Sequence, residues 1–113
     1  MTKTFIQTHE FSINWDDLGF ADEDLRQLEL EIMSYPDKFP VIRGTGGLRK
    51  ARLAANGKGK RGGARVCFID FEFCETVYLI TVYEKTDKDD LSLKERKNIK
   101  NMIESLRVAL GGK

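Results

Sequence analysis

Two segments in the second half of this 113-residue chain constrain its fold more than any other feature. In Ala64–Phe71, and again in Thr76–Tyr83, large apolar side chains fill both sets of alternating positions. Successive side chains of a strand point to opposite faces, so a strand built from either segment is apolar on both faces. Strands of this kind lie inside a sheet that is covered on both sides. We therefore predict that the two segments are central strands.

Local signals predict the remaining elements. They are a strand at Thr4–Thr8, a helical segment at Phe11–Leu18 ended by Gly19, a helix from Asp22 that stops before Pro36, a strand at Leu48–Ala54 and a C-terminal helix. The C-terminal helix opens with a capping box, Ser92 to Glu95, followed by Ile99, Met102, Ile103 and Leu106 at helical spacing. The order β-α-α-β-β-β-α predicts one α+β domain over residues 1–113, with a small antiparallel sheet, two N-terminal helices and one C-terminal helix.

The charges are distributed unevenly, although the formal net charge is only +1. Residues 1–40 carry three bases and nine acids, whereas residues 41–69 carry eight bases and no acid. Glycines interleave with these bases, and Asn56–Gly63 has the composition of a hairpin tip. Such a segment can neutralise phosphates while its backbone approaches them closely. It predicts a surface that holds a polyanion, with RNA as the first candidate; the alternative is a solvated basic hairpin.

Several familiar kinds of site are not supported. His9 is the only histidine, so catalysis by a histidine pair is excluded. The acids Asp70, Glu72 and Glu75 cluster at a turn, where we interpret them as solvated, and we predict no metal site or other cofactor. Cys67 and Cys74 are predicted to be reduced. With no apolar run of membrane or signal-peptide length, we expect a cytoplasmic protein that does not engage membranes.

Lysine, arginine and tyrosine side chains remain available for chemistry. They suffice for phosphoryl transfer when a ribose 2′-hydroxyl is the nucleophile, because cations stabilise the transition state and one group accepts the proton. Lys58 and Lys60 are candidates for the acceptor, since neighbouring Arg61 and Arg65 favour a neutral amine.

Three segments resemble the signature segments of the RelE/HigB superfamily of type II toxins, specifically its HigB-like branch. They are GTGGLRKAR at 44–52, GKGKRGGARV at 57–66 and VYLITVYEKTDKDDLSLKE at 77–95, and the likeness extends over nearly the whole chain. The resemblance implies a ribosome-dependent mRNA endonuclease that works without metal by 2′-hydroxyl attack. It also implies three partners: the 70S ribosome, mRNA and a cognate antitoxin, which we expect to be a helix-turn-helix DNA-binding protein.

The resemblance also implies roles for individual residues. Arg65 matches the family's strand arginine that contacts the scissile phosphate, and Lys85 matches a basic residue at the end of the last strand. Lys58 and Lys60 fall in the region of the family's catalytic lysines. Tyr83 is a candidate for the family's tyrosine, with a core aromatic as the alternative. The residues predicted to bind RNA are Arg49, Lys50, Arg52, Arg61 and Lys88.

Two other functions stay open at this point. One is a ParE-like toxin, which shares the fold but inhibits DNA gyrase. The other is a basic RNA-binding module without catalytic activity. Fold alone does not separate toxins of this superfamily, so the arrangement of the basic side chains has to discriminate between them.

Overall fold

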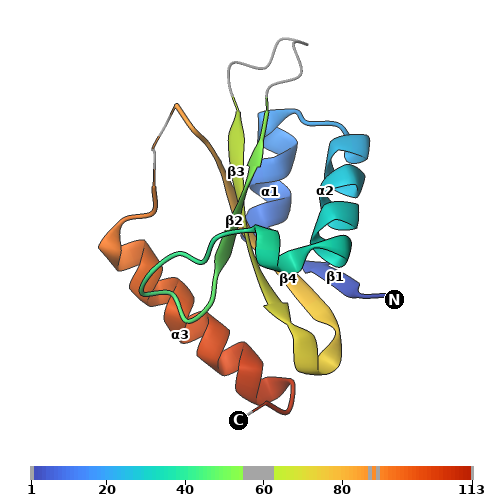
Figure 1. Ribbon diagram of the computed structural model, residues 1–113. Helices are drawn as coiled ribbons and strands as arrows, with labels where there is room; N and C mark the ends of the chain where they lie inside the picture. The colour runs from blue at the N-terminus through green and yellow to red at the C-terminus, as the bar shows by residue number, and fades with distance from the viewer. Residues whose placement is uncertain (1, 55–62, 87, 89, 113) are drawn as a thin grey trace.

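The computed structural model describes residues 2–54, 63–86, 88 and 90–112. Over these residues the chain forms an α+β fold with the predicted order of elements (Figure 1). The elements are β1 (Thr4–Gln7), α1 (His9–Leu18), α2 (Asp22–Ser34), a 3₁₀ turn (Pro36–Lys38), β2 (Arg49–Leu53), β3 (Ala64–Phe71), a second 3₁₀ turn (Glu72–Cys74), β4 (Thr76–Glu84) and α3 (Leu93–Ala109). None of the helices among these residues has both the length and the apolar character needed to cross a membrane.

The sheet has the strand order β1-β4-β3-β2. Strands β2, β3 and β4 pair antiparallel, as predicted, whereas β1 lies parallel to β4. The sheet is therefore mixed, and the prediction of an antiparallel sheet was wrong for β1. The physical reason is that antiparallel pairing suits strands joined by a short turn. Here α1, α2 and two strands separate β1 from β4, so no hairpin sets its direction.

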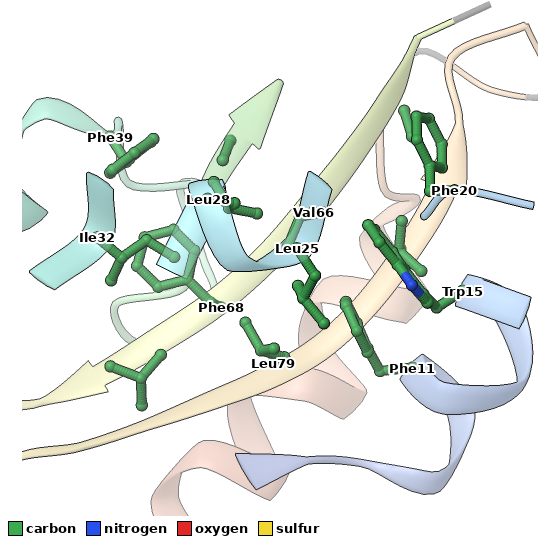
Figure 2. Packing of buried hydrophobic residues seen from close by; sticks show 14 residues of the cluster. Phe11, Trp15, Phe20, Leu25, Leu28, Ile32, Phe39, Val66, Phe68 and Leu79 are labelled. Carbon is green, nitrogen blue, oxygen red and sulfur yellow. The ribbon is translucent and has the colours of Figure 1, made fainter. Parts of the chain in front are cut away.

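Both faces of the sheet are covered, which confirms the interpretation of the central strands. Helices α1 and α2 pack on one face (Figure 1). Figure 2 shows that their aromatic and aliphatic side chains meet those of β3 and β4 in one cluster. This cluster includes Phe11, Trp15, Leu28, Ile32, Val66, Phe68 and Leu79. A second cluster lies on the other face, where Ile99 and Ile103 of α3 pack against Cys67, Ile69 and Ile80.

An irregularity in β4 changes which side chains face α3. Cys67 pairs with Thr81 while Phe68 pairs with Leu79, so Ile80 is an extra residue in β4. Such a bulge shifts the alternation of side chains beyond it. Leu79 therefore belongs to the cluster under α1 and α2, whereas Tyr83, four residues later, belongs to the cluster under α3. Strict alternation would have placed both on one face.

Helix ends follow the predicted signals closely. Gly19 ends α1 with φ of 75°, a left-handed conformation that glycine adopts without strain. At the start of α3, the Ser92 hydroxyl accepts a hydrogen bond from the Glu95 amide (3.1 Å), and the Glu95 carboxylate accepts one from the Ser92 amide (2.9 Å). The predicted stripe on α3 is narrower than expected, because Met102 is 42 % exposed.

Candidate functional site

The predicted site residues divide into three groups. Lys58, Lys60 and Arg61 lie outside the described residues. Arg52, Arg65 and Lys85 come together around one cavity. The others, Arg49, Lys50 and Lys88, do not line this cavity.

Arg52, Arg65 and Tyr83 form a row across three strands. Arg65 of β3 pairs with Arg52 of β2 on one side and with Tyr83 of β4 on the other. Directly paired residues on neighbouring strands share a face, with their Cβ atoms about 5 Å apart. Like charges at paired positions repel each other, and an anion placed between them relieves that repulsion. The row therefore suits a bound phosphate.

The cavity beside this row lies at the end of the sheet from which the basic segment leaves β2. It has a volume of about 290 Å³ and is lined by Arg52, Leu53, Ala54, Gly63, Ala64, Arg65 and Lys85. Arg65 is only 7 % exposed and projects from a central strand, so its position is fixed by the sheet. Arg52 and Lys85 are exposed at the rim. Two strand arginines, on β2 and β3, and a lysine that follows β4 thus border a space that no acidic residue lines within the described part of the chain.

Gly63 allows the two strands below the cavity to approach closely. A Cβ atom at this position would lie 2.7 Å from the backbone oxygen of Leu53, a contact that real Cβ atoms essentially never make. The Gly63 carbonyl also accepts a hydrogen bond from the Lys85 amide (3.0 Å). Gly63 therefore sets the spacing of the strand ends that carry Arg52, Arg65 and Lys85.

We expect Gly63→Ala to lower both stability and activity. Separating the strands removes pairing at the base of the cavity, which we expect to lower the melting temperature by about 5 °C, the shift that corresponds to roughly 1 kcal/mol. Gly44→Ala is the matched control. Gly44 has a φ of 79°, so alanine is strained there, but the added Cβ atom would meet open space. Thermal unfolding should show similar destabilisation of both variants, and assays of the mRNA cleavage that the resemblance implies should show its loss only in Gly63→Ala. Equal cleavage by the two variants would contradict this role.

Arg49 and Lys50 lie on opposite faces of β2. Lys50 pairs with Cys67 and shares the face of Arg52, two residues further along the strand. Arg49 faces the other way and donates hydrogen bonds to the Phe39 carbonyl (2.6 Å) and to Asp37 (3.5 Å). The structure therefore separates Arg49 from the cations around the cavity.

Tyr83 and Cys67 are buried beneath α3 in forms that do not act as bases or nucleophiles at neutral pH. Burial raises the pKa of Tyr83 well above its usual value, so the phenol stays protonated. Its hydroxyl makes no hydrogen bond within the described part of the chain. Burial also raises the pKa of the Cys67 thiol to about 12. Both cysteines are free thiols, as predicted.

Lys88 lies beside Tyr83 and is not a lining residue of the cavity. Its Nζ atom is 4.9 Å from the centre of the Tyr83 ring and 2.5 Å from a carboxylate oxygen of Glu95. In the sequence, the capping box identifies Glu95 as part of the helix start but gives no indication of its contact with Lys88. The hydrogen bond from Lys88 to Glu95 depends on how the chain runs from β4 to α3, which local sequence spacing does not show.

One prediction about the acidic residues was wrong. Asp70 was interpreted as solvated, but its side chain is 5 % exposed and forms an ion pair with Lys3 at 2.6 Å. The reason is the parallel pairing of β1 with β4, the strand between β1 and β3, which brings Lys3 within reach of Asp70 on β3. Glu72 and Glu75 are exposed, as is His9 at the start of α1. Within the described ranges there is no group of three or more His, Cys, Asp or Glu side chains that could hold a metal ion.

Comparison with known proteins identifies the family and the fold. The family described as the RelE toxin of the RelE/RelB toxin-antitoxin system matches residues 43–110. The structure is similar to a free-state mutant of E. coli RelE (TM-score 0.54, 14 % identity, covering 79 % of this chain and 90 % of that one). It is also similar to the intact E. coli RelBE toxin-antitoxin complex (TM-score 0.54, 15 % identity, 74 % and 96 % covered). A third similar structure is that RelE mutant with a peptide of the antitoxin RelB (0.53, 16 %, 77 % and 90 %). These similarities support the fold, and because the family match spans more than half of the sequence, the chain belongs to the RelE family of toxins from toxin-antitoxin systems.

Proposed function

We propose that this toxin is an endoribonuclease that cuts mRNA on the ribosome. The observation that carries the proposal is the cavity bordered by Arg52, Arg65 and Lys85. A non-catalytic module needs only a basic surface, on which cations can be spread apart. Here a fixed arginine and two exposed cations converge on a space whose described lining residues include no acid, which suits the charge of a phosphate in a transition state.

The proposed reaction is transfer of the phosphate to the neighbouring ribose oxygen. The 2′-oxygen attacks phosphorus, the bond from phosphorus to the 5′-oxygen breaks, and the products are a cyclic 2′,3′-phosphate and a free 5′-hydroxyl. One proton leaves the 2′-hydroxyl and one reaches the 5′-oxygen. We assign charge stabilisation to Arg65, because an arginine held rigidly by its strand binds a phosphate through two N–H groups. Lys58 and Lys60 remain the proposed proton carriers.

Mapping mRNA ends in cells tests this function directly. Expression of the chain without its antitoxin should create new 5′ ends within translated reading frames, visible by primer extension. The matched control is the Arg65→Ala variant expressed at the same level. Growth arrest without new mRNA ends, accompanied by loss of gyrase supercoiling activity, would refute the proposal and favour a ParE-like toxin.

We also propose that a cognate antitoxin, a helix-turn-helix DNA-binding protein, neutralises this chain. Residues 41–69 carry eight bases and no acid, so a partner with an acidic segment gains electrostatic attraction when it covers them. Helix α3 offers a second target, since its two buried side chains, Ile99 and Ile103, hold it on the sheet.

We expect the toxin to copurify with the product of the neighbouring gene in its native operon. Adding that protein should stop cleavage and either protect the basic segment from proteolysis or increase amide exchange in α3. A pull-down from the native operon that contains no partner would contradict this expectation.

A further inference from the structure

One carboxylate connects the start of α3 with a lysine beside the site. Glu95 accepts a hydrogen bond from the Ser92 amide through one oxygen (2.9 Å) and from Lys88 Nζ through the other (2.5 Å). In a capping box the glutamate serves only the helix. The second bond, to a residue seven positions earlier, adds nothing to the cap and calls for a separate explanation.

The position of Lys88 suggests what the second bond does. Its ammonium lies 4.9 Å from the centre of the Tyr83 ring, and Tyr83 is the strand partner of Arg65. Lys88 is therefore held next to the row that carries the phosphate-binding arginine. An ammonium has three donors, and the side chain of Lys88 is 36 % exposed. While Glu95 accepts from one donor, the ammonium can still reach an RNA phosphate.

Holding Lys88 has a physical consequence for binding. A lysine side chain rotates about four bonds and loses this freedom when it meets a phosphate. Contacts with a carboxylate on one side and an aromatic ring on the other select one conformation beforehand, so less freedom is lost on binding. The bond from Lys88 also lowers the pKa of Glu95 below its usual value, because it stabilises the charged carboxylate.

We propose that Glu95 is a positioning residue that aims Lys88 at an RNA phosphate beside the one bound by Arg65. The inference rests on the proposed function. It gives Glu95 two separable tasks, one in the helix cap and one in the RNA site.

Two substitutions separate these tasks. Glu95→Gln keeps an oxygen for the Ser92 amide but removes the charge that holds Lys88. Ser92→Ala removes the hydroxyl that accepts from the Glu95 amide and leaves the ion pair in place. Cleavage is measured on ribosomes carrying a defined mRNA, together with melting temperatures. Lys88→Gln and the double variant Lys88→Gln/Glu95→Gln complete the comparison, because a double-mutant cycle reveals whether one residue acts through the other.

We expect Glu95→Gln to lower kcat/KM by about two- to fivefold, the size of the coupling in exposed ion pairs, with little change in melting temperature. The double variant should cleave no more slowly than Lys88→Gln alone. Ser92→Ala should melt about 5 °C lower and cleave normally below its transition. The inference is overturned, but the proposed function is not, if Glu95→Gln cleaves at the wild-type rate. The same holds if Glu95→Gln lowers cleavage equally in the presence of Lys88 and in the Lys88→Gln background. A wild-type protein that leaves mRNA uncut overturns the proposed function, and the inference with it.

Discussion

Arg65→Ala is expected to lower mRNA cleavage by about a hundredfold or more. Arg65 lines the cavity from a central strand, and its strand partners are Arg52 and Tyr83. A fixed cation of this kind acts where charge accumulates on phosphorus in the transition state. Loss of one such group removes on the order of 3 kcal/mol of stabilisation. The growth of cells expressing the variant, compared with wild type at equal protein level, gives the first measurement.

The control for this variant has to address burial, because Arg65 is 7 % exposed and its truncation leaves space in the sheet. Thermal unfolding shows whether the variant is folded at the assay temperature. Arg65→Lys keeps a positive charge but loses the two-pronged contact, so we expect intermediate activity. Arg26→Ala removes an exposed cation from α2 that does not line the cavity, and should remain fully toxic. Undiminished growth inhibition by a folded Arg65→Ala protein would show that the assignment is wrong.

The sequence predicted those parts of the fold that depend on neighbouring residues. The bounds of β3 were predicted residue for residue, because Ala64–Phe71 is apolar apart from Arg65 and Asp70 and lies between a glycine pair and a turn. The start of α3 was predicted because a capping box lies within four residues. In both cases the interactions that set the element are local, so spacing alone identifies them.

Features that depend on contacts between distant residues were not predicted. The parallel direction of β1 and the ion pair between Lys3 and Asp70 arise where the N-terminal segment meets strands much later in the chain. The bulge at Ile80 has no signature in composition, yet it decides that Tyr83 lies beside Arg65 beneath α3. The arrangement of the candidate site residues therefore depends on contacts between distant parts of the chain, which local sequence patterns do not show.

Cleavage by this toxin is expected to depend strongly on the ribosome. Attack by a 2′-oxygen requires that oxygen, phosphorus and the leaving oxygen to lie in line, and holding them so is worth roughly 7 kcal/mol or more. Proteins that arrange single-stranded RNA themselves stack its bases on aromatic rings. The sequence has no Phe, Tyr or Trp between Val41 and Val66. Tyr83, the aromatic residue paired with Arg65, is buried and has Lys88 over its ring.

The chain therefore supplies charge at the phosphate but, in its described residues, no aromatic surface at the cavity on which to arrange the bases. We expect purified toxin to leave naked mRNA essentially intact and to cut the same mRNA on translating ribosomes, where the A site holds the codon in shape. A barrier difference of about 7 kcal/mol corresponds to roughly five powers of ten in rate. Gel analysis of both substrates at matched concentrations measures the ratio, with Arg65→Ala as the inactive control. Efficient cleavage of free RNA would mean that the protein arranges its own substrate, and that surfaces beyond the cavity contact the bases.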